Sequence, residues 1–222
     1  MGVVVIFAPN QTVVFFGDSI TDHGRDREAP ASMGDGYVSR IVEGLREWRN
    51  DLHFVNAGIS GDTTRNLLAR LETDVLSQHP DWVSIAIGVN DVWRSFGVGD
   101  TRDAVGIVEF EANYRELIRK ILETGARLVL VEPFVIEPDH SEPFKAQVDA
   151  YAQVVEKLAR DSEAVFVPFQ RAFDRISDAS ANMWSEDRVH PNAAGVDLMA
   201  EEFLRTVDPE GFGQAAEHQA TS

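Results

Sequence analysis

The sequence predicts an α/β protein in which helices cover both faces of a parallel β-sheet. Short apolar runs, rich in β-branched and aromatic residues, alternate along the chain with longer segments whose apolar residues recur at helical spacing. This alternation is typical of parallel strands joined by right-handed crossover helices. With 222 residues, 44% of them hydrophobic and 26% charged, the chain is long enough for one domain with a substantial core.

The strands are expected where the apolar runs are short and bounded by turn residues. The first run, Val13 to Phe16, is continuous, as expected of a strand buried on both faces, and it gives way at Gly17 to polar sequence. The expected strands are Val13 to Phe16, Leu52 to Val55, Trp82 to Ile87, Leu128 to Val131 and Ala164 to Val167.

The helices are expected between these strands. In the first long one, apolar side chains repeat every three or four residues, and charged side chains occupy the opposite face. Asp62 or Thr63 can cap the second, Gly125 ends the third, and Asn192 is a natural cap for the last. The expected helices are Tyr37 to Trp48, Asp62 or Thr63 to about Leu76, roughly Asp103 to Glu123, Glu142 to Arg160, a short one from Gln170, and about Ala193 to Thr206.

The two ends of the chain differ from this pattern. Residues 1–207 are expected to form a single domain, and the small, polar residues 208–222 a loose tail. Val3 to Phe7 is apolar but lacks a basic flank and is too short for a secretory signal or a membrane span. We interpret it as an added edge strand or a flap, and expect a cytoplasmic protein.

Charge and cysteine content exclude several classes of function. The net charge of −17 argues against nucleic acids and anionic membranes as partners. The absence of cysteine excludes a disulfide framework, a zinc–thiolate site and a thiol nucleophile. A homo-oligomer is compatible with the sequence.

Polar or small residues follow three of the expected strands at the point where each strand ends. Ser19 follows the first strand, Gly58 the second and Asn90 the third. Because the carboxyl ends of parallel strands share one edge of a sheet, these residues are expected to lie close together, where open α/β sheets bind their ligands.

Two further residues supply what a serine nucleophile requires. His190, in the loop before the last helix, can act as the base for Ser19, and Asp187 can accept from the other ring nitrogen. Pro191 keeps His190 outside the helix that follows. The backbone N–H groups of Ser19 and Gly58 and the side-chain amide of Asn90 are candidate donors for an oxyanion hole.

These residues lie in four short blocks that resemble the GDSL, or SGNH, hydrolases. The blocks occur in the family's order and are Gly17-Asp18-Ser19-Ile20, Asn56-Ala57-Gly58, Gly88-Val89-Asn90-Asp91 and Asp187-Arg188-Val189-His190-Pro191. Ile20 stands where the family's name has leucine. The longer matches Gly17 to Asp22, Gly88 to Trp93 and Asp187 to Asn192 resemble the branch of intracellular acetyl xylan esterases.

The resemblance implies a flavodoxin-like, three-layer fold with a five-stranded parallel sheet in the order 2-1-3-4-5. It also implies an esterase without metal or organic cofactor. The expected substrates are small acylated, most often acetylated, sugars such as xylo-oligosaccharides.

Several residues near these blocks have more than one interpretation. Gly58 can also be the glycine that a tight turn needs, and Asp91 is better explained as a cap or a structural acceptor. Candidates for contact with substrate are Asp18, Trp93, Arg94, Phe134 and Trp184, although the aromatic ones could equally be core residues. His23 and His140 have no partner visible in the sequence.

Other functions were weighed against a sugar esterase. The alternative within the same family is a general short-chain esterase, a lysophospholipase or a thioesterase, but the short polar loop Gly24 to Asp35 favours a small acyl group. A metal-dependent phosphoesterase could be built from six side chains, Asp18, Asp22, His23, Asp91, Asp187 and His190, yet it would not need Ser19. A non-catalytic sugar-binding module would not need serine, histidine and aspartate together.

Overall fold

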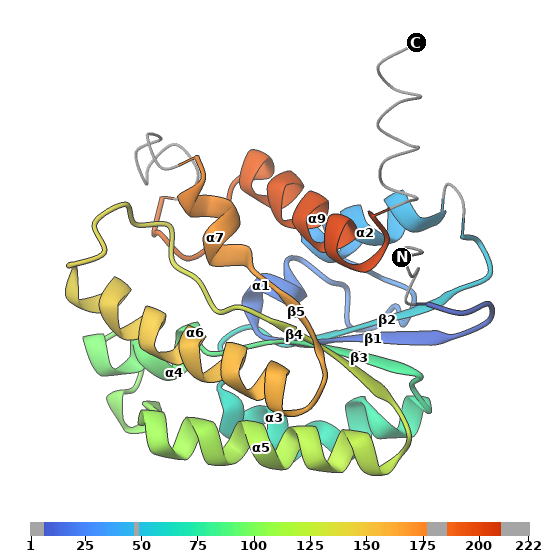
Figure 1. The fold of residues 1–222 in the computed structure, drawn as a ribbon, viewed down its shortest axis with the longest axis horizontal. Coiled ribbons are helices and arrows are strands. Elements are labelled where there is room, and N and C mark those ends of the chain that lie inside the picture. Colours follow the sequence, from blue (N-terminus) through green and yellow to red (C-terminus); the bar gives the residue numbers. More distant parts are fainter. Residues whose placement is uncertain (1–6, 47–48, 177–185, 210–222) are drawn as a thin grey trace.

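A parallel five-stranded sheet forms the centre of the protein, as the computed structural model shows for residues 7–46, 49–176 and 186–209 (Figure 1). The strand order is β2-β1-β3-β4-β5, which confirms the order implied by the family resemblance. The strands are β1 (Thr12–Gly17), β2 (His53–Gly58), β3 (Trp82–Ala86), β4 (Arg127–Val131) and β5 (Val165–Val167).

Helices cover the sheet on both faces, so the protein has three layers. On one face lie α2 (Tyr37–Arg46), α7 (Phe169–Asp174) and α9 (Ala193–Val207). On the other lie α3 (Thr64–Asp74), α5 (Ile107–Glu123) and α6 (Pro143–Asp161). The short helices are α1 (Ser19–Asp22) and α4 (Val89–Trp93), with 3-10 turns at Leu76–Gln78, Arg94–Phe96 and Thr101–Asp103. Within the described residues, no helix has the length and apolar character needed to cross a membrane.

The core confirms the interpretation of the first strand. Val13, Val14, Phe15 and Phe16 are fully buried, since helices pack on both faces of the sheet. β1 and β2 pair in register as far as Gly17 and Gly58, so β2 extends beyond the expected end at Val55. Their two glycines therefore meet at the carboxyl edge of the sheet.

The predicted caps of two helices are confirmed. Thr63 precedes α3, where its N–H donates to the Asn66 side chain at 2.9 Å. Asn192 caps α9, and its Oδ1 accepts the Gly195 N–H at 3.2 Å. Local sequence is sufficient for these predictions because both partners lie within three residues.

The start of α5 was predicted wrongly. Residues Thr101–Asp103 form a 3-10 turn, and the helix begins only at Ile107, after Gly106 as its cap. The reason is that Val105 is buried and its N–H donates to the carbonyl of Asp91 at 3.1 Å. This tertiary contact holds the chain in an extended conformation where periodicity alone would continue a helix.

Some expectations fall on residues outside the described part of the chain. The proposed edge strand or flap lies there apart from Phe7, which packs edge-on against Trp82 with ring centroids 5.4 Å apart. The last two residues of the first long helix, 47–48, and residues 210–222 of the proposed tail also lie there.

Candidate active site

Ser19 projects from a sharply constrained turn after β1. It is the first residue of α1, and Asp18 caps that helix by accepting the Ile20 N–H at 3.0 Å. Gly17 leaves no space for a side chain, because a Cβ atom there would clash with the carbonyl oxygen of Ala86 on β3. The close packing of β1 and β3 thus fixes the backbone that carries Ser19.

Ser19, His190 and Asp187 form a continuous chain of hydrogen bonds. The Ser19 Oγ lies 2.7 Å from His190 Nε2, and His190 Nδ1 lies 2.6 Å from Asp187 Oδ2. The side chain of His190 is 39% exposed, so a substrate in solution can reach it. The structure therefore brings together three residues that are separated by as many as 171 positions in the sequence.

The loop that carries Asp187 and His190 is held by its own backbone. Arg188 adopts a left-handed conformation with φ of 68°, which turns the chain so that Asp187 Oδ1 accepts the N–H groups of Val189 and His190. Partial burial would raise the pKa of Asp187, but its bonds from the His190 ring and from these two N–H groups lower the pKa to about 2. Asp187 is thus ionised and oriented toward the imidazole.

This loop is also attached to the segment after β4. The Ile136 N–H donates to the carbonyl of Arg188 at 2.7 Å, and the Arg188 guanidinium donates to Glu137 at 2.8 Å. Val189 is fully buried. These contacts fix the position of His190 relative to the sheet edge that carries Ser19.

Asn90 lies in α4 at the same edge. Gly88, with φ of 136°, begins this helix, and Asn90 is buried. One hydrogen of its Nδ2 is donated to the carbonyl of Asp62 at 3.1 Å. An amide nitrogen carries two hydrogens, so the second can serve another acceptor.

The structure does not support Gly58 as an oxyanion donor. Its N–H already donates to Asn56 Oδ1 at 2.9 Å. A Cβ atom at Gly58 would clash with the backbone nitrogen of Asp22, because β2 and α1 pack closely here. The steric interpretation of Gly58 therefore explains this glycine.

A second glycine, Gly61, has the free N–H group that Gly58 lacks. Within the described part of the chain its N–H has no acceptor, and its φ is 87°. Its carbonyl accepts from Arg94 at 2.9 Å, and the next residue, Asp62, is the one bonded to Asn90. The sequence reasoning missed Gly61, although a glycine just before the predicted cap of α3 was a signal that could have found it.

The candidate substrate contacts have different surroundings. The ring of Trp93 packs against the His190 ring, with centroids 6.1 Å apart, and stacks on Phe144. Arg94 instead donates to the carbonyls of Gly61 and Val98, so its guanidinium holds two loops together. Phe134 is buried and stacks on Phe173. Trp184 lies outside the described residues.

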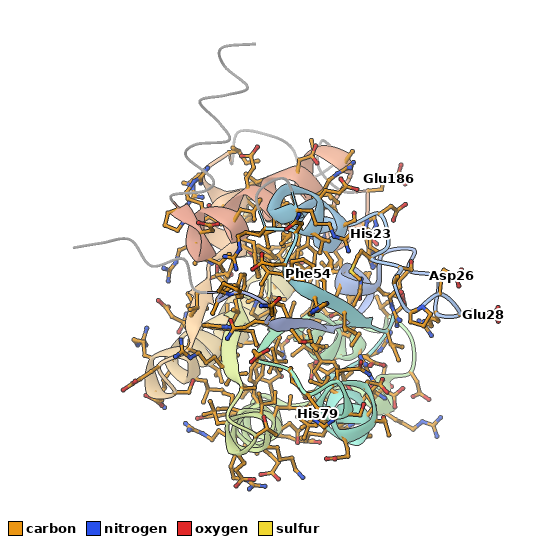
Figure 2. The ribbon with its side chains drawn as sticks, turned by 90° about the vertical axis from the view of Figure 1, so that its right-hand side faces the viewer. His23, Asp26, Glu28, Phe54, His79 and Glu186 are labelled. Carbon is orange, nitrogen blue, oxygen red and sulfur yellow. The ribbon has the colours of Figure 1, made fainter. Side chains whose placement is uncertain are left out.

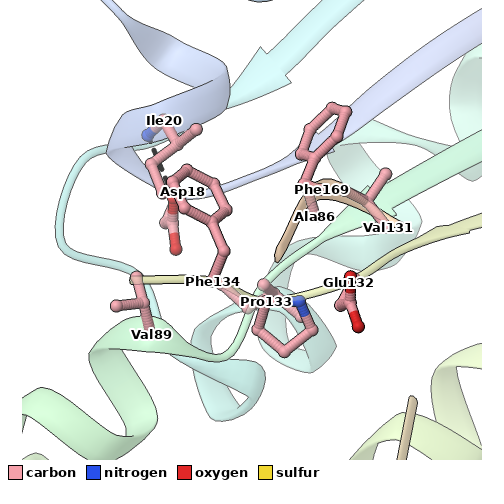
Figure 3. Close-up of a pocket in the computed structure, with 10 residues that line it drawn as sticks. Asp18, Ile20, Ala86, Val89, Val131, Glu132, Pro133, Phe134 and Phe169 are labelled. Atoms are coloured by element: carbon pink, nitrogen blue, oxygen red, sulfur yellow. Dashed lines mark hydrogen bonds between the residues drawn. The ribbon is translucent and has the colours of Figure 1, made fainter. Parts of the chain in front are cut away.

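An apolar cavity opens at the carboxyl edge of the sheet (Figure 3). Its lining includes both sequence neighbours of Ser19, which are Asp18 and Ile20, and the neighbour of Asn90, Val89. Phe134 lies beside Asp18 in this cavity. Burial raises the pKa of Asp18 to about 7, and that of Glu132, which also lines the cavity, to about 7.

The residues weighed for a metal site have other partners. His23 Nδ1 lies 2.8 Å from Asp35, and Figure 2 shows His23 near a peripheral loop whose Asp26 and Glu28 project outward. Asp91 is buried and accepts the N–H and Oγ1 of Thr64, which confirms it as a structural acceptor. Among the described residues, no group of three or more histidine, aspartate or glutamate side chains is arranged to hold a metal ion.

Comparison with known proteins decides the family. The model described as the GDSL-like Lipase/Acylhydrolase family matches residues 15–198. The chain belongs to this family. As a member of the GDSL-like hydrolases it is a carboxylic ester hydrolase, like the esterases to which it is similar.

Two bacterial esterases are similar to this chain over most of its length. An acetylxylan esterase of Geobacillus stearothermophilus is 40% identical over 207 residues, which cover 89% of this chain and 94% of the relative. Esterase TesA of Pseudomonas aeruginosa is 26% identical over 206 residues, covering 91% and 90%.

A solved structure shows the same fold. The crystal structure of Axe2, an acetylxylan esterase from Geobacillus stearothermophilus, matches with a TM-score of 0.88 and 37% identity, covering 91% of this chain and 96% of Axe2. Other structures of Axe2 are described as catalytic mutants in which a serine, an aspartate or a histidine is replaced by alanine.

Proposed function

We propose that the protein is a serine esterase that removes small acyl groups, above all acetyl, from acetylated carbohydrates such as xylo-oligosaccharides. The observation that carries the proposal is the hydrogen-bonded chain Ser19–His190–Asp187 at the carboxyl edge of the sheet. The catalytic mutants of Axe2 concern the same three residue types, which supports these roles.

In the first half of the reaction, Ser19 attacks the ester. His190 Nε2 takes the Ser19 proton while Oγ bonds to the carbonyl carbon, and the imidazolium is stabilised by ionised Asp187. The tetrahedral intermediate then collapses, and His190 returns the proton to the departing sugar hydroxyl. In the second half, His190 takes a proton from a water molecule as the water oxygen bonds to the carbonyl carbon of the acyl-serine. The bond from that carbon to Ser19 Oγ then breaks, His190 returns the proton to Oγ, and the acid is released as acetate.

The negative oxygen of each tetrahedral intermediate requires hydrogen-bond donors. We assign this role to the N–H of Ser19, the free hydrogen of Asn90 Nδ2 and the N–H of Gly61. Gly61 replaces Gly58 in this proposal, because the Gly58 N–H is bonded to Asn56 whereas the Gly61 N–H has no acceptor in the described part of the chain. Asp62 links the last two donors, since it follows Gly61 and accepts from Asn90.

The choice of acetyl over longer acyl groups rests on two supports. The relative with 40% identity is an acetylxylan esterase. The cavity that Asp18 and Ile20 help to line also has the buried rings of Phe134 and Phe169 in its lining, and these bulky side chains favour a short acyl chain. The second candidate, a thioesterase or lysophospholipase, is favoured by the similarity to TesA and to the Escherichia coli thioesterase 1/protease 1/lysophospholipase L1 at 23% identity.

The nucleophile is tested with Ser19→Ala. Ester hydrolysis should fall by about 10⁶-fold, the usual loss when a triad serine is removed. The fold should persist, because the hydroxyl contributes one hydrogen bond and little packing. A serine-directed fluorophosphonate should transfer its phosphonyl group to Ser19 of the wild-type protein, with loss of fluoride, and leave Ser19→Ala unlabelled. Normal turnover by the alanine variant would contradict the mechanism.

The acyl group is tested with a panel of sugar esters that differ only in chain length. Acetyl esters should be cleaved at the highest kcat/KM, and octanoyl esters far more slowly, because each added methylene can change the transition-state energy by about 1–3 kcal/mol. Acetylated xylo-oligosaccharides and an acetylated non-sugar alcohol, compared at equal acyl length, identify the leaving group. Equal or faster cleavage of long chains would favour the thioesterase or lysophospholipase alternative.

A further inference from the structure

Arg70, on α3, contacts the strand ends that carry the proposed active site but is not itself part of the site. Its side chain is only 13% exposed, and its guanidinium carbon lies 4.5 Å above the ring of Phe16 on β1. Nε donates to Asp62 at 2.6 Å, Nη1 to Asp74 at 3.0 Å, and the two terminal nitrogens also reach backbone carbonyls. Every nitrogen of the group is therefore engaged within the protein.

The backbone carbonyls that Arg70 contacts are those of the two strand ends that meet at the site. Nη2 donates to the carbonyl of Gly17 at 3.0 Å, and Nη1 to the carbonyl of Ala57 at 2.7 Å. Gly17 lies two residues before Ser19, and Ala57 lies at the end of β2, where the chain enters the loop that contains Gly61. One planar group thus joins the strand that carries the nucleophile to the start of that loop.

The third contact places the end of the same loop. Asp62 directly follows Gly61, and its own carbonyl accepts from Asn90 at 3.1 Å. The Asp62 carboxylate, only 11% exposed, is held by Arg70 Nε. Arg70 therefore contacts Gly17, two residues before Ser19, and Asp62, which follows Gly61 and accepts from Asn90, so its contacts lie near all three proposed oxyanion donors.

Arginine is the side chain that can make these contacts together. Its guanidinium is planar, stays charged and presents five N–H donors in a fixed arrangement, whereas a lysine ammonium is a single point of charge. The acceptors of Arg70 lie on β1, on β2 and in the loop, so a single nitrogen cannot reach them all.

We propose that Arg70 is a positioning residue for catalysis, which holds the nucleophile strand and the oxyanion loop in the relative positions that the transition state requires. This inference rests on the proposed function. Arg70 contacts no substrate; it acts through Ser19, Gly61 and Asn90. Displacement of catalytic groups by about 1 Å can cost roughly 10²-fold in rate, which sets the size of the expected effect.

The test compares Arg70→Met with Arg65→Met on an acetyl ester. Arg65 lies on the same helix, but its guanidinium pairs with the exposed side chain of Glu109 on α5 and contacts neither strand end of the site. Active sites are counted by titration with a fluorophosphonate, so that kcat is expressed per competent site. Arg70→Met should lower kcat about 10²-fold with KM changed less than about threefold, because both acylation and deacylation need the oxyanion donors. Arg65→Met should match the wild type.

Binding of a transition-state analogue separates positioning from folding. Methylboronic acid forms a tetrahedral adduct with a serine, and one of its oxygens occupies the oxyanion position. In Arg70→Met, the inhibition constant of methylboronic acid should rise by a factor similar to the fall in kcat, whereas KM should stay near the wild-type value. Arg70→Lys should recover only a small part of kcat. If Arg70→Met does not fold, Arg70→Lys and Asp62→Asn provide the same comparison, each with a reduced kcat and an unchanged KM.

Three results would overturn the inference: a kcat per titrated site within twofold of wild type in Arg70→Met, full recovery by Arg70→Lys, or wild-type boronate binding. If any of these results occurs while Ser19→Ala is inactive and Asn90→Ala has a strongly reduced kcat, the proposed function stands and only the role of Arg70 fails. If Ser19→Ala remains active, the proposed function itself fails.

Discussion

At the scale of single residues, Asn90 is the side chain to which we assign both a structural and a catalytic hydrogen bond. One amide hydrogen joins it to Asp62, which fixes the orientation of the group. The other is the donor that we assign to the oxyanion. Because the group is buried and already oriented, no reorganisation is needed when negative charge develops on the substrate.

Replacement of Asn90 by alanine should therefore lower kcat by about 10²–10³-fold, or roughly 3–4 kcal/mol, while KM changes little. Asn90→Asp should be no better, since a carboxylate would repel both the oxyanion and the carbonyl of Asp62. Steady-state kinetics on an acetyl ester measures both constants. A raised KM with normal kcat would show that Asn90 binds the ground state, and the proposed oxyanion hole would then be incorrect.

At the scale of secondary-structure elements, the site depends on how closely β1, β2 and α1 approach one another. Gly17 and Gly58 are paired in the sheet, and neither leaves space for a Cβ atom. At Gly58 the obstructing atoms belong to the backbone of α1, which cannot rotate away as a side chain could. The position of α1, which carries Ser19, thus depends on the neighbouring strand having glycine, which has no Cβ atom, at position 58.

Gly58→Ala should reduce the free energy of unfolding by about 1–3 kcal/mol, because the new Cβ atom overpacks a close contact. The same variant should have lower activity, because α1 is displaced. Gly106→Ala is the control, because nothing lies within 4 Å of a Cβ atom there and Gly106 only caps α5. That variant should cost about 1 kcal/mol or less, because alanine is a poorer N-cap than glycine but meets no steric obstacle there. Urea unfolding of both variants provides the measurement, and equal stabilities would contradict the steric argument.

At the scale of the whole molecule, stability should depend on pH through buried carboxyl groups. Burial raises the pKa of Asp18, Asp91 and Glu132 to about 7 in the folded protein, against ordinary values near 4 in the unfolded chain. Between these values the folded protein binds more protons, so stability falls as the pH rises from about 4 to about 7. Asp187 acts in the opposite direction: its pKa of about 2 adds stability above pH ~4 that is lost on further acidification.

The melting temperature should therefore be higher near pH ~5 than near pH ~8. The net charge of −17 contributes in the same direction by self-repulsion, and high salt should remove that contribution but not the effect of burial. Asp18→Asn keeps an oxygen that can accept the Ile20 N–H. In this variant the fall in the free energy of unfolding between pH ~5 and pH ~8 should be smaller by roughly 2–4 kcal/mol. The exposed Asp26→Asn is the control with the same loss of charge, and an equal effect of both substitutions would contradict the argument.

The sequence by itself was sufficient for those features that depend on neighbouring residues. The five strands, the caps at Thr63 and Asn192, and the choice of Ser19, Asp187 and His190 all follow from patterns within a few residues, combined with the rule that parallel strands end at one edge. Strand order came from the family resemblance. The strands, their order and the two caps are confirmed because local preference and tertiary packing agree, whereas the catalytic roles of Ser19, Asp187 and His190 stay a prediction.

Only the tertiary structure decided which donors are free and which side chains hold the site together. The sequence does not distinguish Gly58 from Gly61 as a hydrogen-bond donor. In the folded chain the Gly58 N–H donates to Asn56, whereas the Gly61 N–H has no acceptor within the described residues. Arg70 contacts Gly17 across 53 residues of sequence. Such contacts depend on where distant segments meet in space, and a pattern of neighbouring residues contains no information on that distance.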